Sequence, residues 1–171
     1  AAQFFRDVRI TPIYEGTNGI QAADLVGRKL GRDGGSTMAT VLKMIRDDGK
    51  ALVSAGGDLY IIGGELLKAV ARHEEVTELV LQMLAATPEA ARSAAFDYMM
   101  ATGYLFGGWQ LGRAAQVARA RLDGGEDNEF LSRKVSTAAF YAQSILPRCE
   151  GHIGAIGGAS GVLQAYPVEW L

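Results

Sequence analysis

The sequence has little of what disulfide-bonded, metal-binding or membrane proteins need. Its single cysteine, Cys149, cannot form a disulfide within the chain and offers a structural zinc site too few thiolates. Only two residues are histidine, and the Glu-x-x-His motif of di-iron bundles does not occur. The longest uncharged stretches, 98–112 and 151–168, are too short or too rich in glycine to span a bilayer. We therefore expect no metal site, no membrane span and a reducing, cytoplasmic location.

An excess of one charge is also missing. Lysine and arginine number 17 against 19 aspartate and glutamate residues, without a basic cluster, which argues against nucleic acid as a partner. The first residues, Ala-Ala-Gln-Phe-Phe-Arg, have no basic n-region and no cleavage site, so they do not predict a signal peptide. With 49% hydrophobic and 21% charged residues, the chain is expected to fold around one core.

Two regions of different character follow one another along the chain. Residues 1–33 hold a dense, irregular mixture of motif-like residues, whereas residues 36–160 repeat long helical patterns. The glycine-rich stretch 31–35 separates them as a loop. Strand signals are too few to build a sheet, so the predicted fold class is all-α.

The second region predicts four long amphipathic helices, because its apolar residues recur at alternating three- and four-residue steps. Their starts are marked by capping residues or turns, at Ser36 and Thr37, at 56–58, at Thr87-Pro88-Glu89 and at 122–127. The four expected core stripes are Met38, Val41, Leu42, Ile45, Leu52 and Val53; Leu59, Ile62, Leu66, Ala69, His73, Val76, Val80 and Met83; Ala91, Ala95, Tyr98, Thr102, Leu105, Trp109 and Gly112; and Leu131, Val135, Ala138, Ala142, Ile145, Cys149, His152 and Ile156.

Short loops between these helices favour an up-down-up-down bundle in which sequential helices are antiparallel neighbours. Small residues on the third helix imply close packing on one side, and Pro147 is expected to kink the fourth because it has no N–H to donate. The tail 157–171 has no clear period. Its apolar residues predict a segment folded back onto the bundle, namely Leu163, Tyr166, Val168 and Trp170.

The first region places an acid, Glu15, on a loop just before a helix. Pro12 and nearby glycines favour the loop, and the apolar positions of the following helix are Ile20, Ala23, Leu25, Val26 and Leu30. Backbone N–H groups at a helix N-terminus favour an ionised carboxylate and can also donate to a substrate oxygen. A general base and an oxyanion site can therefore share this turn.

The stretch Phe-Phe-Arg-Asp-Val-Arg-Ile (4–10) followed by Tyr-Glu-Gly-Thr-Asn-Gly-Ile-Gln (14–21) resembles the end of the acyl-CoA dehydrogenase catalytic domain. The resemblance implies that Glu15 is the base that removes the α proton, that its N–H holds the thioester oxygen, and that Gly16 lies against the substrate. It also implies that Thr17, Asn18 and Gly19 form the turn that contacts FAD. Many relatives carry Gln or Glu where this chain has Gly19, which leaves backbone contacts at that position.

The length of chain after this motif is similar to that of the larger bacterial type, which has an extra C-terminal helical domain and includes 3-methylmercaptopropionyl-CoA dehydrogenases. The resemblance implies that residues 1–33 end the catalytic domain as a short helical remnant and that residues 36–171 form the extra domain. It further implies an FAD-dependent oxidoreductase that converts an acyl-CoA to a 2-enoyl-CoA, an electron-transfer flavoprotein as partner, and a homodimer or higher homo-oligomer. The fragment alone is expected to be inactive. The alternative is a helical interaction or oligomerisation module accessory to the enzyme.

Three other groups of residues allow a functional and a structural interpretation. His73 and His152, with Cys149 one turn before the latter, suggest either a metal or proton-relay site or hydrogen-bonded core histidines, and we favour the latter. Tyr98, Tyr104, Phe106 and Trp109 either line a groove or pack, and we favour packing. The first region's basic residues either contact a phosphate or are solvated, and we favour solvation for most of them: Arg6, Arg9, Arg28, Lys29 and Arg32.

Overall fold

The computed structural model describes residues 2–11, 13, 17–158, 161, 165, 167 and 169. In chain order the elements are α1 (Ala2–Val8), α2 (Asn18–Ala23), the π-helical segment η1 (Asp24–Leu30), the 3₁₀ turn η2 (Gly31–Asp33), α3 (Ser36–Ala55), α4 (Gly57–Ala86), α5 (Pro88–Asp123), α6 (Glu129–Phe140), the π-helical segment η3 (Tyr141–Ile145), the 3₁₀ turn η4 (Leu146–Arg148) and α7 (Cys149–Ala155). The described residues contain no strand. The all-α prediction is confirmed.

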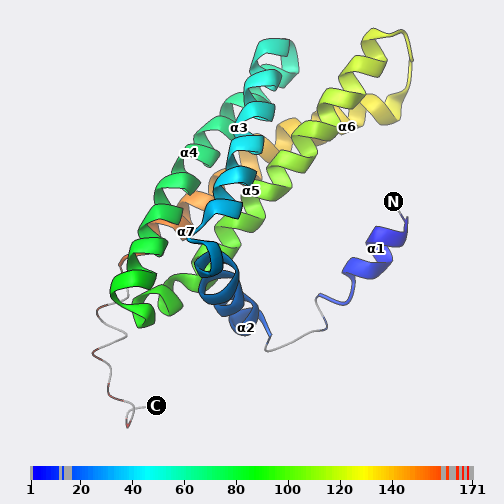
Figure 1. Ribbon diagram of the computed structural model, residues 1–171. Helices are drawn as coiled ribbons and strands as arrows, with labels where there is room; N and C mark the ends of the chain where they lie inside the picture. The colour runs from blue at the N-terminus through cyan, green and yellow to red at the C-terminus, as the bar shows by residue number, and fades with distance from the viewer. Residues whose placement is uncertain are drawn as a thin grey trace.

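The long helices form the predicted up-down-up-down bundle. Figure 1 shows α3 running away from α2, α4 returning beside it, α5 running out again, and α6 to α7 returning along α5. The connections are short. Gly56, at φ 74°, joins α3 to α4, and Thr87 joins α4 to α5. The hydroxyl of Thr87 makes no cap bond to α5, contrary to prediction, and the proline at the first position of that helix marks its start.

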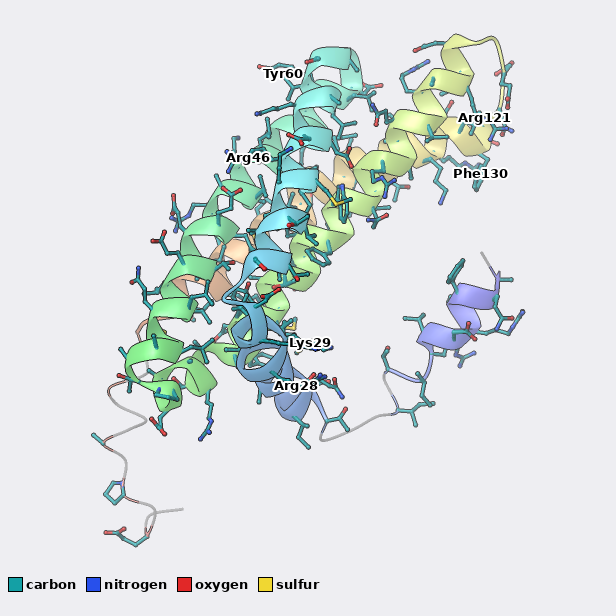
Figure 2. The ribbon with its side chains drawn as sticks, in the orientation of Figure 1. Arg28, Lys29, Arg46, Tyr60, Arg121 and Phe130 are labelled. Carbon is teal, nitrogen blue, oxygen red and sulfur yellow. The ribbon has the colours of Figure 1, made fainter. Side chains whose placement is uncertain are left out.

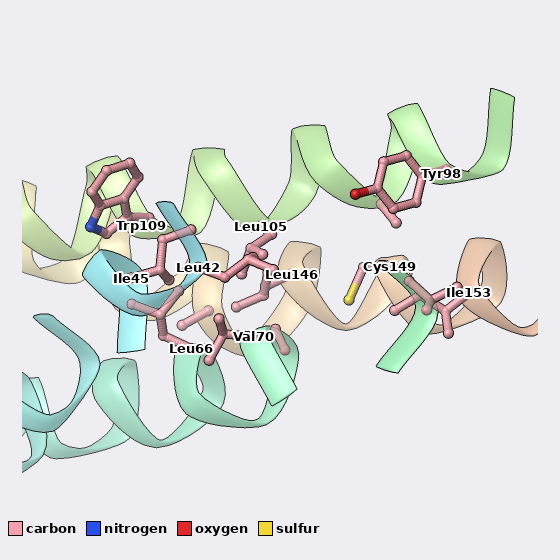
Figure 3. Close-up of a cluster of buried hydrophobic side chains, with 14 of the residues drawn as sticks. Leu42, Ile45, Leu66, Val70, Tyr98, Leu105, Trp109, Leu146, Cys149 and Ile153 are labelled. Atoms are coloured by element: carbon pink, nitrogen blue, oxygen red, sulfur yellow. The ribbon is translucent and has the colours of Figure 1, made fainter. Parts of the chain in front are cut away.

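The predicted stripes of the first three bundle helices form most of the core (Figure 3). Tyr98, Ile45 and Leu52 are fully buried, and Val76, an expected core position, is 3% exposed. Only the ends of the stripes are half-buried, at Met38, Val41, Val53 and Met83. A three-four repeat over several turns therefore identified the buried face correctly wherever the helix is regular.

The fourth stripe is correct at Leu131, Val135, Ala138, Ala142, Cys149 and Ile156, which are all buried, and is offset by one residue at two positions. Leu146 and Ile153 are buried, whereas Ile145 and His152, which the sequence placed on the stripe, are half-buried. The cause is the π-helical segment η3, whose wider turn takes up one more residue than an α-turn. Figure 3 shows Leu146 and Ile153 pointing into the cluster. The prediction of Ile145 as a core position was wrong.

The helix that follows the motif region is packed onto the bundle through a similar irregularity. Ala22, Val26 and Leu30 are buried in the same core cluster as the bundle residues, against α5. Ile20 and Ala23, predicted as apolar contact positions, are instead exposed. The buried residues Ala22, Val26 and Leu30 are four positions apart. Because η1 is π-helical, this spacing keeps them on the face that packs against α5.

The start of α3 is capped by a residue that the sequence analysis did not select. The carboxylate of Asp33 accepts the backbone N–H groups of Gly35, at 3.1 Å, and Thr37, at 3.0 Å. Thr37 also donates its hydroxyl to the carboxylate of Asp33. The hydrogen bonds from Thr37 hold the pKa of Asp33 below its usual value. Asp33 is thus the functional cap, and Ser36 and Thr37 are not.

Helices α3 and α4 touch backbone to backbone where Gly49 crosses Gly63. A Cβ atom added to Gly63 would lie 2.7 Å from both the carbonyl oxygen of Gly49 and the backbone nitrogen of Val53. At the next residue, Gly64, an added Cβ would meet nothing within 4 Å. Two adjacent glycines therefore differ in what they do for the fold.

We expect alanine at these two positions to change the free energy of unfolding in opposite directions. Gly63→Ala should destabilise the chain by about 1–3 kcal/mol, because the two helix backbones must separate. Gly64→Ala should stabilise it by about 0.5–1 kcal/mol, because alanine loses less backbone entropy in a helix. Urea denaturation followed by circular dichroism measures both. A shift of the same sign for both variants would contradict the crossing at Gly63.

The predicted fold-back of the C-terminal tail cannot be compared with the structure. The apolar residues on which it depends, Leu163, Tyr166, Val168 and Trp170, lie outside the described residues.

Candidate functional site

The residues of the predicted flavin turn lie together at the start of α2. Thr17 is half-buried and precedes the helix, and its carbonyl accepts the N–H of Gln21 at 2.8 Å. Asn18 and Gly19 are the first two residues of α2 and are exposed. The predicted base, Glu15, and Gly16 lie outside the described residues, so their roles stay predictions.

The first turn of α2 has the chemistry of an anion site. In any helix the first backbone N–H groups have no intrahelical acceptor and lie at the positive end of the helix dipole. At Gly19 an added Cβ would meet no atom within 4 Å, so a ligand can approach the backbone closely. Phosphate groups suit such a turn. The residues present therefore fit a phosphate-bearing cofactor such as FAD.

The turn is held in place by the helix behind it. Val26 and Leu30 anchor η1 in the bundle core, at 1% and 3% exposure. On the outer side, Asp24 forms a 2.5 Å ion pair with Arg28 and a 3.6 Å pair with Lys29. The hydrogen bond from Arg28 lowers the pKa of Asp24. Figure 2 shows Arg28 and Lys29 on the outer face of this helix.

The basic residues of the first region are solvated, as predicted. All five are exposed: Arg6, Arg9, Arg28, Lys29 and Arg32.

The first 20 residues expose an unusual amount of apolar surface. Helix α1 buries none of its residues and lies apart from the bundle in Figure 1. The exposed large apolar side chains are Phe4, Phe5, Val8, Ile10, Ile13 and Ile20, from 49% to 79% exposed. Apolar surface gathered in this way marks a site that another surface covers.

His73 belongs to a closed hydrogen-bond cluster between α4 and α5. Thr102 donates its one hydroxyl proton to the carbonyl of Tyr98, so the 3.1 Å bond to His73 must be donated by Nε2–H of the imidazole. In the same way Thr77 donates to the carbonyl of His73 and accepts from the Tyr98 hydroxyl at 2.9 Å. The two rings stack with centroids 5.0 Å apart. His73 is thus a hydrogen-bonded core histidine, as predicted.

His152 and Cys149 are also explained by structure: His152 has a hydrogen-bond partner, and Cys149 is buried. Nδ1 of His152 lies 2.8 Å from the carboxylate of Asp97 and joins α7 to α5, while its ring stacks on Tyr104. Burial raises the pKa of the Cys149 thiol to about 11, which keeps it protonated and unreactive. Within the described part of the chain, no three His, Cys, Asp or Glu side chains are grouped so that they could hold a metal ion.

Most of the aromatic stripe on α5 packs, as predicted. Tyr98 is fully buried, and Trp109 donates its indole N–H to Asp48 on α3 at 2.6 Å. Phe106 meets Trp109 edge to face. Tyr98 and Trp109 thus tie α5 to its neighbours.

A groove between α5, η3 and the segment after α1 was not predicted from the sequence. Its volume is about 620 Å³. The lining residues define what we call the α5–η3 groove: Thr11, Met99, Met100, Gly103, Tyr104 and Tyr141. Tyr141 lies 37 residues after Tyr104 and reaches its carbonyl across the helix interface, a contact that no pattern within a single helix indicates.

Comparison with known proteins gives one family and two relatives. Residues 37–165 match the family described as "Acetyl-CoA dehydrogenase C-terminal like". The sequence is 42% identical over 148 residues to the 3-methylmercaptopropionyl-CoA dehydrogenase of Ruegeria pomeroyi, covering 86% of this chain and 25% of that protein. It is 33% identical over 165 residues to the broad-specificity linear acyl-CoA dehydrogenase FadE5 of Mycobacterium tuberculosis, covering 85% of this chain and 25% of that protein. The chain thus spans about a quarter of the length of both relatives. Of the helices described, none combines the length and the apolar character needed to cross a membrane.

Proposed function

Because the chain belongs to the acetyl-CoA dehydrogenase C-terminal-like family, we propose that it is the C-terminal part of an FAD-dependent acyl-CoA dehydrogenase. The full-length parent enzyme oxidises the α,β C–C bond of an acyl-CoA thioester to give the 2-enoyl-CoA. Glu15 is the base, Gly16 lies against the substrate, and Thr17, Asn18 and Gly19 form the cofactor turn. Residues 1–33 end the catalytic domain, and residues 36–171 form the extra helical domain.

The observation that carries this proposal is the two-sided packing of residues 18–30. One face, with Val26 and Leu30, is buried in the bundle, while Ile20 on the other face is 68% exposed. Phe4 and Phe5, upstream of the motif, are exposed in the same way. Apolar surface of this kind needs another protein surface to cover it. The rest of the parent, which corresponds to the other three quarters of the relatives' length, supplies that surface.

The chemistry follows from the types of group at the turn. The carboxylate of Glu15 accepts the α proton, and backbone N–H groups hold the thioester oxygen on which negative charge develops. Bound FAD supplies the acceptor for the hydride that leaves the β carbon. The α proton and the β hydride together account for the new double bond. The bundle holds the helix on which this turn is built.

The partners are proposed from the family. Both relatives carry acyl-CoA dehydrogenase names, one with a short thioether substrate and one with linear acyl chains, so an acyl-CoA is the substrate class. An electron-transfer flavoprotein takes the electrons, and the parent is a homodimer or higher homo-oligomer in the cytoplasm.

Comparing the full-length parent with the isolated chain tests the proposal. The parent should retain FAD through gel filtration, and acyl-CoA should bleach the flavin. The isolated chain should be helical by circular dichroism, retain no flavin and support no acyl-CoA-dependent dye reduction. A parent that holds no flavin would overturn the enzyme assignment. Flavin retention with turnover by the isolated chain would show that it is a complete enzyme.

A further inference from the structure

We propose that the α5–η3 groove seats a helix of the parent's catalytic domain, from the part of the parent that precedes this chain. The groove is then a joint through which the helical domain is attached to the catalytic domain. This inference rests on the proposed function, because it takes the chain as the C-terminal part of a longer enzyme.

The lining of the groove has the composition of a protein interface. It consists of two tyrosines, two methionines, a threonine and a glycine, and none of these six residues is charged. Tyrosine and methionine are enriched in protein–protein interfaces, whereas charged residues are depleted at interface cores. Met99 and Met100, both half-buried, have unbranched side chains that adjust to the shape of what packs on them. The groove therefore suits another protein surface.

The polar groups of the lining do not favour a small ligand. The hydroxyl of Thr11 donates to the carbonyl of Val8 at 2.7 Å, and the phenol of Tyr141 donates to the carbonyl of Tyr104 at 3.1 Å. Small-molecule sites orient their ligands with a few well-placed polar groups, and these two donors are already used within the protein. An apolar side chain on a helix needs no such group, because the helix itself positions it.

The groove adjoins the apolar surface of α1. Val8, the last residue of α1, is 55% exposed, and the hydrogen bond from Thr11 to its carbonyl ties this helix to the edge of the groove. Helix α1 buries none of its residues and lies apart from the bundle in Figure 1. A body that covers α1 therefore meets the groove at Thr11. The chain covers 25% of each relative, so the rest of the parent is large enough to be that body.

Gly103 indicates that the occupant approaches α5 closely. A glycine within a helix lowers its stability relative to alanine, yet within the described structure a Cβ added to Gly103 would meet nothing within 4 Å. Gly107, one turn later, differs, because an added Cβ would come 2.5 Å from the hydroxyl oxygen of Tyr141. Packing inside the chain thus explains Gly107, whereas Gly103 leaves room for a backbone from outside it. A helix that crosses α5 at Gly103 uses this room.

Oxidation of methionine by hydrogen peroxide tests whether the groove is filled, because the sulfoxide forms where peroxide reaches the sulfur. Met99 and Met100 should be oxidised at least about fivefold more slowly in the full-length parent than in the isolated chain, as measured by mass spectrometry of their peptide. Met44, which is 50% exposed on α3 and does not line the groove, is the control and should react equally in both proteins. Equal oxidation rates of Met99 and Met100 in the two proteins would overturn the proposal.

A groove-filling variant tests the same contact by competition. Gly103→Phe places a large side chain where the isolated chain has open space, so the thermal midpoint of the isolated chain should not fall. In the parent the ring displaces the seated helix, and the first thermal transition should fall by about 4 °C or more. Gly64→Phe on α4, also a glycine with open space, is the matched control and should lower neither transition. A parent whose first transition is unchanged by Gly103→Phe would contradict the seated helix.

Other occupants give different results. Protection of Met99 and Met100 in the isolated chain that grows with protein concentration would indicate a second copy, and protection of the parent only after acyl-CoA is added would indicate a ligand. Either result would overturn the proposal. A parent that holds no FAD would overturn the proposed function whatever the methionines show, so the two failures are distinguishable. If Gly103→Phe does not fold, the oxidation rates of the wild-type proteins decide alone.

Discussion

In the full-length parent, Glu15→Gln is expected to slow the reduction of flavin by acyl-CoA by about 10²–10⁴-fold, the range that general bases contribute. The amide is nearly isosteric with the carboxylate and keeps the chain conformation at the turn, but it cannot accept the α proton. The backbone donors of the turn are unchanged, so substrate and flavin should still bind. Stopped-flow bleaching of the flavin measures the rate, and the flavin content of the purified variant checks the fold.

A second amide substitution separates loss of the base from loss of charge. Glu78→Gln, at an exposed position on α4, makes the same chemical change away from the turn and should leave the rate of flavin reduction unchanged. Equal rates for Glu15→Gln and the wild type would remove Glu15 from its proposed role. A variant that lost its flavin would be assigned to structure, and the aspartate variant, which retains a carboxylate, would then show whether proton abstraction can be restored.

The regular part of the fold was predictable because one physical rule governs it. A helix that buries one face against its neighbours repeats apolar residues every three or four positions, and α3, α4 and α5 keep this rule over their whole length. The proline after Thr87 and the glycine at 56 also mark helix boundaries. The fixed φ of proline suits the first position of a helix, and the positive φ of Gly56 is incompatible with continuing one.

The exchange of buried positions after the π-helical segment η3 was not predictable in this way. In η3 the helix winds more widely, which buries Leu146 in place of Ile145 and Ile153 in place of His152, while the predicted positions Cys149 and Ile156 stay buried. The apolar pattern alone allowed both Ile145 and Leu146, since the two residues are adjacent and both are aliphatic. The choice is made by packing, because Leu146 lies against Gly108 of α5, where an added Cβ would come 3.2 Å from the leucine side chain.

The site was predictable only through its motif, and the groove not at all. Thr17, Asn18 and Gly19 are adjacent in sequence, so their common position at the start of α2 follows from the chain itself. The α5–η3 groove joins residues from three separate segments, and the hydrogen bond that closes it runs from a side chain to a backbone carbonyl. Such contacts depend on how two helices meet, which helical periodicity does not specify.

The buried cluster around His73 has a consequence for stability in acid. Since Nε2–H donates to Thr102, the imidazole carries its lone pair on Nδ1, and within the described structure this buried atom has no hydrogen-bond partner. A proton added to Nδ1 would place a charge in the core without an acceptor. Burial accordingly lowers the pKa of His73 from 6.5 to about 4.

This lowered pKa predicts that the chain loses stability as the pH falls from 6.5 toward 4. In that interval the unfolded chain binds a proton at His73 that the folded chain excludes, so acid favours unfolding, by about 3 kcal/mol at pH 4 relative to pH 7. His73→Gln keeps a donor for Thr102 but cannot titrate, and its free energy of unfolding should be less sensitive to acid by this amount. Urea titrations at pH 7, 5 and 4 measure the difference, and the carboxylates common to both proteins cancel from it. His152→Gln, at the other, half-buried histidine, is the matched control and should follow the wild type more closely. Equal acid sensitivity of His73→Gln and the wild type would mean that the folded chain accommodates a charged His73, and that the cluster is open to water.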